Sequence, residues 1–287
     1  MENNIIKTES IDVINSFIKI QSKHIKKNQS WYHPAYLEGY NHLFNNTFSV
    51  EGFKAKLGSI DWDIKFVDGY ISGYEYFKNL GNQILPVINQ VRGKNQLLYA
   101  DFPDMIHDTI GHAPMLFNKD YVSFLKKIYA IIESVNQKEI DKEYLSLQGV
   151  TKSEREQNLS KFSKIEEELK KNPTEFYTIN NIALWTIEFG VLISGDNHKA
   201  YGAAIVASPL EIDNLINKKI PIKNLLNIDS PSFNFSELQD ELYSTEKLEN
   251  VIDFMLSNNR SNLNKSRLNT YIKAQTKDSI SSLKKSE

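Results

Sequence analysis

The sequence contains no cysteine among its 287 residues. This excludes disulfide bridges, thiolate metal sites and cysteine nucleophiles, and it is compatible with a reducing compartment. An excess of one charge is also missing, because 34 Lys and Arg face 36 Asp and Glu, for a formal net charge of -2. The charge balance therefore gives no electrostatic footprint for nucleic acid, and we expect no nucleic-acid partner.

Long hydrophobic runs are missing as well. The first ten residues, MENNIIKTES, lack the basic start and the apolar stretch of a secretory signal. The longest apolar run covers residues 182–193, is too short to span a bilayer and contains Glu188. We therefore expect a cytoplasmic protein that makes no contact with membranes.

Apolar and aromatic residues are plentiful enough to build a sizeable core, at 40% and 11% of the chain. Helical spacing predicts helices at 5–25, 35–57 and 120–135, and Pro103 with Asp104 suits the first turn of another. Thr174 is a candidate cap for a long helix that ends near 194–195, before a loop at 195–204. Short strands are predicted at 61–70, 85–91 and 96–100.

Residues 137–172 are rich in Lys and Glu and are interpreted as a solvated helical excursion. Residues 257–287 are polar and rich in Ser, Asn and Lys, which is typical of a tail. No repeat or clear linker is visible. The sequence thus predicts a mainly α fold with a few short β-strands, as a single domain at 1–256 followed by the tail 257–287.

Two histidines lie five residues apart in FPDMIHDTIGHAPMLF, at positions 107 and 112. On an α-helix, five residues leave the two side chains about 140° apart, so both imidazoles cannot face one way. Gly111 and Pro114 predict that the helix ends near Gly111 and frees His112 to turn toward a metal. Two satisfied, partly buried histidines are the plain alternative.

Glu188 lies inside the apolar run IALWTIEFGVLI. A buried carboxylate is costly unless it is paired, and a divalent metal shared with His107 and His112 would pair it. Two imidazoles and one carboxylate form the facial triad of non-haem Fe(II) oxygenases, but the same set also binds catalytic zinc. A buried ion pair with Lys or Arg is the remaining alternative for Glu188.

Three blocks of sequence, LPVINQVRGKNQLLYADFPDMIHDTIGHAPMLFN, TIEFG and GDNHKAYGAAIVASP, occur in an order that resembles a known family. The chain is similar over about 35–255 to the catalytic domain of the tetrahydropterin-dependent aromatic amino acid hydroxylases, most closely the short bacterial phenylalanine 4-hydroxylases. The resemblance implies a monooxygenase that uses Fe(II), tetrahydropterin and O2 to hydroxylate an aromatic ring. Phenylalanine is the expected substrate and tyrosine the product; Trp, Tyr or a non-standard aromatic amino acid are alternatives.

The resemblance also implies roles for individual residues. The iron ligands and catalytic centre would be His107, His112 and Glu188. Arg92 would bind the substrate α-carboxylate and Asp104 would orient that arginine. The pterin would stack on Tyr76, meet the backbone of Ile71, Ser72 and Gly73, and contact Asp108 through water. Pro103 and Phe189 are retained in the expected substrate pocket, and Tyr201 and Gly202 would support the metal region.

The chain departs from the family's pattern in the expected substrate region. Leu184 stands where the family has a tryptophan, Ala207 where it has a serine and Ala204 where it has a glycine, while Phe102 replaces a glutamate. These changes leave the metal ligands in place and put the substrate in question.

Two other functions use the same residues. One is a zinc hydrolase with Asp108 as the base, and the other is a non-catalytic sensor that binds an amino acid or a pterin. For the hydroxylase we expect pterin-recycling enzymes as partners, and a monomer or small oligomer.

Overall fold

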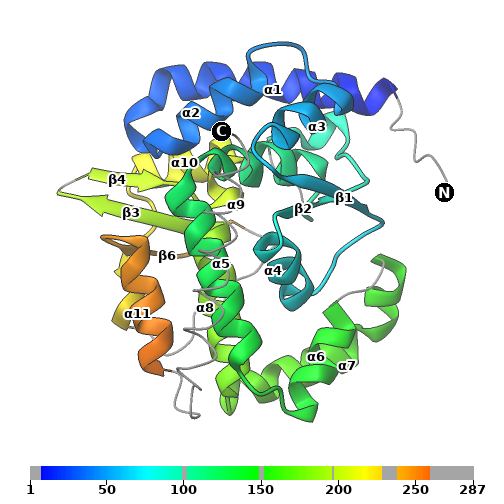
Figure 1. Cartoon of the computed structure of the whole chain (residues 1–287), viewed down its shortest axis with the longest axis vertical. Coiled ribbons are helices and arrows are strands. Elements are labelled where there is room, and N and C mark those ends of the chain that lie inside the picture. The colour runs from blue at the N-terminus through cyan, green and yellow to red at the C-terminus, as the bar shows by residue number, and fades with distance from the viewer. Residues whose placement is uncertain (1–7, 99–101, 149–151, 196, 228–237, 259–287) are drawn as a thin grey trace, which may run out of the picture.

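The computed structural model describes residues 8–98, 102–148, 152–195, 197–227 and 238–258, and helices dominate them (Figure 1). The α-helices are α1 (Thr8–Asn28), α2 (Pro34–Phe44), α3 (Val50–Gly58), α4 (Gly73–Gly81), α5 (Lys119–Ser134), α6 (Glu139–Gln148), α7 (Lys152–Lys171), α8 (Glu175–Phe189), α9 (Ala203–Val206), α10 (Pro209–Ile216) and α11 (Leu248–Asn258). The strands are β1 (Asp63–Val67), β2 (Ile84–Ile88), β3 (Gly190–Ser194), β4 (Asn197–Ala200), β5 (Ile222–Asn224) and β6 (Leu242–Thr245). The predicted fold class is confirmed.

The N-terminal helices follow the predicted periodicity. The helix expected at 5–25 is α1, whereas the pattern at 35–57 is divided between α2 and α3. The division falls at the polar segment after Phe44, and the Ser49 hydroxyl begins α3 by accepting a hydrogen bond from the Gly52 amide at 3.1 Å. The helix predicted at 120–135 is confirmed as α5.

Strands β1 and β2 form a parallel pair, with α4 as the connection between them. They confirm the strands predicted at 61–70 and 85–91, and the register runs from Asp63 opposite Ile84 to Val67 opposite Ile88. The strand predicted at 96–100 is wrong where the structure describes it. Residues 94–96 form a 3-10 turn and residues 97–98 a further turn, and residues 99–100 lie outside the described part.

The helix predicted from Thr174 begins there, since the Thr174 hydroxyl accepts a hydrogen bond from the Tyr177 amide at 3.0 Å. Its predicted end near 194–195 is wrong, because α8 ends at Phe189 and the chain continues directly into β3. Strand β3 lies inside a four-stranded sheet with the order β4-β3-β6-β5. The predicted loop at 195–204 accordingly contains β4 and the start of α9.

The segment predicted as a solvated helical excursion forms α6 and α7, which lie at the lower right of Figure 1. A small apolar cluster of Tyr144, Leu169 and Tyr177 holds these helices against α8. Within the described ranges, no helix is both long and apolar enough to cross a membrane.

Candidate metal centre

A π-helix, His107–His112, carries two of the three candidate ligands. Its hydrogen bonds join residues five apart, as from the Ala113 amide to the Asp108 carbonyl. Residues five apart therefore lie about one turn apart, and both imidazoles face the same way. The predicted break near Gly111 is wrong, because the π-helix continues into a 3-10 turn, Ala113–Phe117.

The start of this segment also differs from the prediction. Pro103 lies before the first helical residue, Met105, and does not occupy the first turn. Asp104 caps the segment instead, since its Oδ1 accepts a hydrogen bond from the His107 amide at 3.0 Å. The same carboxylate thus fixes the backbone that carries the first candidate ligand.

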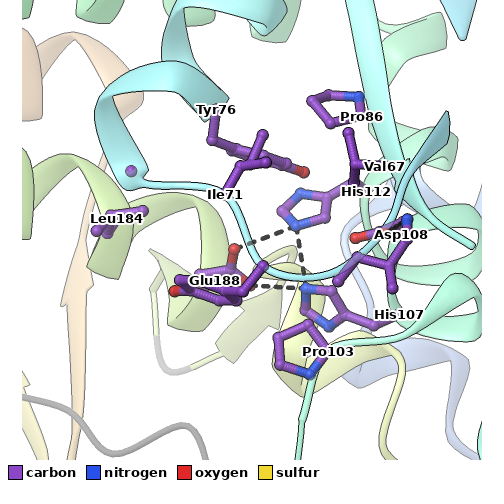
Figure 2. Close-up of a pocket in the computed structure, with 13 residues that line it drawn as sticks. Val67, Ile71, Tyr76, Pro86, Pro103, His107, Asp108, His112, Leu184 and Glu188 are labelled. Atoms are coloured by element: carbon purple, nitrogen blue, oxygen red, sulfur yellow. Dashed lines mark hydrogen bonds and ion pairs between the residues drawn. The ribbon is translucent and has the colours of Figure 1, made fainter. Parts of the chain in front are cut away.

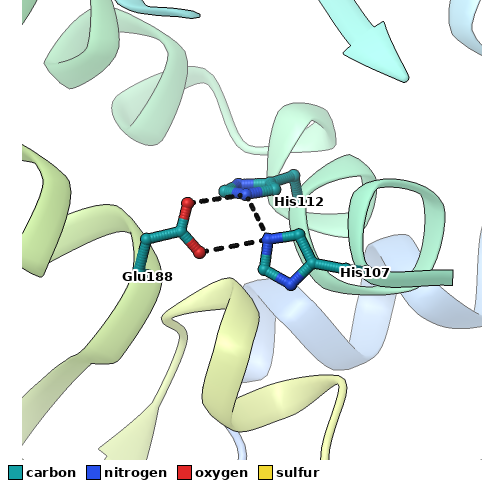
Figure 3. A group of neighbouring side chains, drawn as sticks. All are labelled: His107, His112 and Glu188. Atoms are coloured by element: carbon teal, nitrogen blue, oxygen red, sulfur yellow. Dashed lines mark hydrogen bonds and ion pairs between the residues drawn. The ribbon is translucent and has the colours of Figure 1, made fainter. Parts of the chain in front are cut away.

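Figure 3 shows the three candidate ligand side chains pointing toward one another. Glu188 Oε2 lies 3.1 Å from His107 Nε2, and Glu188 Oε1 lies 3.2 Å from His112 Nε2. The two Nε2 atoms are 3.2 Å apart, and all three residues are buried. Three donors at these separations can reach one ion with bonds of about 2.0–2.2 Å.

The end of α8 holds Glu188 in this position through close backbone packing. The amides of Tyr201 and Gly202 both donate to the Gly190 carbonyl at 3.0 Å. A Cβ atom on Gly202 would lie 2.6 Å from the Glu188 carbonyl carbon. Only glycine lets the loop approach the helix end this closely.

The charge state of Glu188 fits a cation site. Burial alone would favour the neutral carboxyl, but the imidazoles of His112 and His107 lower its pKa well below the usual value. Its buried Oε2 meets the His107 imidazole at 3.1 Å. The alternative ion pair with Lys or Arg is not found there, since the ion pairs of Glu188 are with the two histidines.

The three side chains lie at a pocket whose empty space, including the part open to solvent, is about 440 Å³ (Figure 2). Its lining is mainly apolar and comes from β1, β2, α4, α8 and the π-helix. Of the residues predicted to contact a pterin, those that line this pocket are Ile71, Gly73, Tyr76 and Asp108. Ser72 does not line it, and its hydroxyl caps α4 by accepting from the Glu75 amide at 3.3 Å.

Asp108 is buried in this pocket, and Tyr76 is partly buried there with its hydroxyl oxygen buried. Asp108 Oδ2 accepts a hydrogen bond from the Ile88 amide at 2.7 Å, which ties β2 to the π-helix, and burial raises the pKa of this carboxyl to about 7. The Tyr76 ring centroid lies 5.2 Å from that of His112. Burial, together with the carboxylates of Asp108 and Glu188, raises the pKa of Tyr76 well above its usual value, so the phenol keeps its proton.

The predicted pairing of Arg92 with Asp104 is present. Arg92 Nε and Nη2 donate to the two carboxylate oxygens of Asp104 at 2.9 and 2.7 Å, and its amide donates to Oδ2 at 2.8 Å. The Arg92 side chain is only 6% exposed and does not line the pocket. Its role toward a substrate carboxylate stays a prediction.

Only some of the other residues predicted to bind the substrate line the pocket. Pro103 and Leu184 line the pocket, whereas Phe189 and Ala207 are buried elsewhere. Four further residues, Val67, Tyr70, Pro86 and Ile88, also line the pocket, and the sequence analysis gave none of them an individual role. They lie within the strands predicted at 61–70 and 85–91, and the pairing of those strands is parallel in the structure. The rule that ligands bind at the carboxyl ends of parallel strands could have found part of this set, had that pairing been known.

Comparison with known sequences gives one family. Residues 50–147 match the biopterin-dependent aromatic amino acid hydroxylases, a range that holds both histidines but not Glu188. A probable aromatic amino acid hydroxylase of Chlamydia pneumoniae is 23% identical over 193 residues, which are 65% of this chain and 47% of the relative. A phenylalanine-4-hydroxylase of Mesorhizobium japonicum is 33% identical over 97 residues, 33% of this chain and 35% of the relative. The chain thus spans less than half the length of these curated relatives.

Comparison with solved structures gives the fold. Phenylalanine hydroxylase of Chromobacterium violaceum, with bound iron(III) and oxidised cofactor 7,8-dihydrobiopterin, superimposes with a TM-score of 0.63. The two are 19% identical, and the match covers 88% of this chain and 80% of that one. A phenylalanine hydroxylase from Legionella pneumophila gives the same TM-score and covers 93% of this chain and 92% of its own, again at 19% identity.

Proposed function

We propose that this chain, which resembles the biopterin-dependent aromatic amino acid hydroxylases and has their fold, is an iron- and tetrahydropterin-dependent aromatic amino acid monooxygenase. The observation that carries the proposal is the buried triangle of His107, His112 and Glu188 at one end of an apolar pocket. L-Phenylalanine is the proposed substrate and L-tyrosine the product. Trp, Tyr or a non-standard aromatic amino acid remain as alternative substrates.

The triangle brings two imidazoles and one carboxylate within 3.1 to 3.2 Å of one another. This ligand set suits both a facial iron site and a catalytic zinc site. The resemblance to the biopterin-dependent hydroxylases favours iron. A facial site leaves positions open toward the pocket, which a reaction with O2 requires.

Iron and tetrahydropterin would together supply the redox chemistry that activates O2. The protein supplies binding and orientation. His107, His112 and Glu188 hold the metal on one face, and the buried Asp108 adds a carboxyl group beside them. The apolar wall that includes Ile71, Pro103 and Leu184 excludes water and suits an aromatic ring.

The decisive experiment loads the full chain anaerobically with Fe(II) and tetrahydropterin and then adds O2 with Phe, Tyr or Trp. Hydroxylated product that requires all three additions supports the monooxygenase. Turnover of an amide or ester substrate by the zinc-loaded chain, without pterin or O2, supports the hydrolase. Binding of amino acid and pterin without any turnover supports the sensor.

Further proposals concern the organisation of the chain. We place the hydroxylase domain at 1–256 and a polar tail at 257–287, although α11 continues to Asn258. We propose that the enzyme is cytoplasmic, works as a monomer or small oligomer, and depends on a pterin-recycling enzyme. Cell fractionation, light scattering and turnover coupled to a pterin reductase would test these points.

A further inference from the structure

The hydroxyl group of Tyr76 is a buried polar group in the pocket to which the proposed function gives no task. The resemblance assigns a role to the ring, as a surface for the pterin, and none to the oxygen. This oxygen is buried and forms no hydrogen bond with any described residue. Since an unpaired buried hydroxyl destabilises a fold, we expect it to meet a partner when the pocket is filled.

The position of Tyr76 limits which groups could accept a hydrogen bond from its hydroxyl. The residue lines the same pocket as His107, His112 and Glu188, and its ring is tilted by 54° against the His112 ring at 5.2 Å. Figure 2 shows the ring reaching from α4 into the pocket, with the hydroxyl end beside His112. The two carboxylates that line the pocket belong to Asp108 and Glu188. Neither accepts a hydrogen bond from the Tyr76 hydroxyl in the structure.

We infer that the Tyr76 hydroxyl donates a hydrogen bond to a small ligand, such as water, dioxygen or an anion, held at the open side of the metal site. The inference rests on the proposed metal centre. An anion bound to a cation there would be a charged acceptor, and hydrogen bonds to charged acceptors are the stronger ones. The ring of the same residue can still stack on a pterin while its hydroxyl group donates to such a ligand.

The test uses azide as the probe on the Fe(III)-loaded full chain. Azide binding is titrated through its charge-transfer absorption in the wild type and in Tyr76→Phe, which keeps the ring and removes only the oxygen. Loss of one hydrogen bond to this charged probe should weaken azide binding about ten- to a hundredfold. Tyr74→Phe is the matched control, because Tyr74 lies on the same helix, bonds to Glu133 at 3.1 Å and does not line the pocket.

A second readout separates this role from a structural one. Thermal unfolding of the metal-free protein should give the same or a higher Tm for Tyr76→Phe, because the hydroxyl has no partner in the fold. A lower Tm would mean that the hydroxyl holds the fold, and it overturns the inference. Tyr76→Ala, which removes the ring as well, should in addition weaken pterin binding.

Azide affinity, pterin affinity and iron uptake give the remaining outcomes. Equal azide affinity in the wild type and Tyr76→Phe overturns the inference and leaves the proposed function intact. Equal azide affinity with weaker pterin binding in Tyr76→Phe assigns the hydroxyl to the pterin and also overturns it. A wild-type chain that takes up no iron removes the proposed function and the inference together.

Discussion

The carboxylate of Glu188 joins α8 to the π-helix. The candidate metal site therefore forms only when these two segments pack together. Its two oxygens face one histidine each, at 3.1 and 3.2 Å. The sequence could identify it, because a lone acidic residue inside an apolar run needs a partner. The sequence could not show how His112 reaches the same point, because a π-helix gives no recognisable residue pattern.

Glu188→Ala should therefore lose most of its iron. Removal of one of three ligands leaves two imidazoles, which bind a divalent ion weakly. The wild type should hold one iron per chain by metal analysis after reconstitution. Glu211→Gln is a suitable control, since it changes a buried carboxylate outside the pocket and should keep full iron content. Full occupancy in Glu188→Ala would contradict the assignment.

The residues that line the pocket should determine which aromatic ring the proposed enzyme prefers. Leu184 lines the pocket where the family has a tryptophan, and a smaller wall should discriminate less sharply among rings. Phe should be a substrate, with unusually high side activity on Tyr, Trp or a substituted aromatic amino acid. Competition assays that give kcat/KM for each ring measure this directly.

Leu184→Trp should sharpen the preference for one ring, by about tenfold or more if the fit changes by about 1–3 kcal/mol. Leu159→Trp places the same change on an exposed part of α7 and should have no effect on selectivity. Strict selectivity for Phe in the wild type would refute the loose-pocket argument.

At the scale of elements, amphipathic helices and half-buried strands could be predicted, and the junctions could not. The run from Ile182 to Ile193 is apolar at nearly every position, so its period does not distinguish helix from strand. The change at Gly190 depends on tertiary contact, because a Cβ there would lie 2.3 Å from Tyr201 Cζ. Local sequence could not reveal this packing.

The same junction gives a prediction for the loop after β4. A Cβ on Gly202 would lie 2.2 Å from the Gly190 nitrogen and 2.6 Å from the Glu188 carbonyl oxygen, both backbone atoms that cannot turn away. Gly202→Ala should cost about 1–3 kcal/mol of stability and reduce iron content, because it displaces the end of α8. Chemical denaturation and metal analysis measure both effects.

Gly58→Ala is the matched control, since nothing lies within 4 Å of its added methyl group. Its stability should be unchanged or slightly higher. If both variants were equally stable, the close approach of the loop to the helix end would not be required for the fold.

At the scale of the whole molecule, stability should depend on pH through Glu211. Burial raises the pKa of this carboxyl to about 7 from an ordinary 4.5, so the folded state binds its proton more tightly than the unfolded state. The stability it contributes is therefore present below about pH 4.5 and is lost as the pH rises through 7. Glu211→Gln should raise the stability at pH 8 by up to about 3 kcal/mol and change it little at pH 4.

Thermal unfolding at pH 4 to 8 compares the stability of the wild type with that of Glu211→Gln. Glu156→Gln, on the exposed face of α7, is the control. Parallel curves for the wild type and Glu211→Gln would show that Glu211 titrates normally. Its Oε1 accepts from the Gln239 amide at 3.2 Å, a bond that glutamine can keep.

The C-terminal tail supplies the second test of the whole molecule. Removal of residues from Lys265 onward should leave iron binding and turnover largely intact, because that segment is polar and lies beyond the family-like range. Metal analysis and turnover of the shortened chain measure this, and failure to fold would show that the tail packs on the domain or joins subunits.

The Asp104 carboxylate has two sets of partners. It accepts hydrogen bonds from the Arg92 guanidinium and from the backbone amide of His107. If an amino acid carboxylate binds at Arg92, it pulls on the group that positions the first metal ligand. Any factor by which the amino acid alters metal affinity must then equal the factor by which the metal alters amino acid affinity. Under that condition Asp104 would make the metal and the amino acid heterotropic effectors of each other, with one coupling factor shared by both.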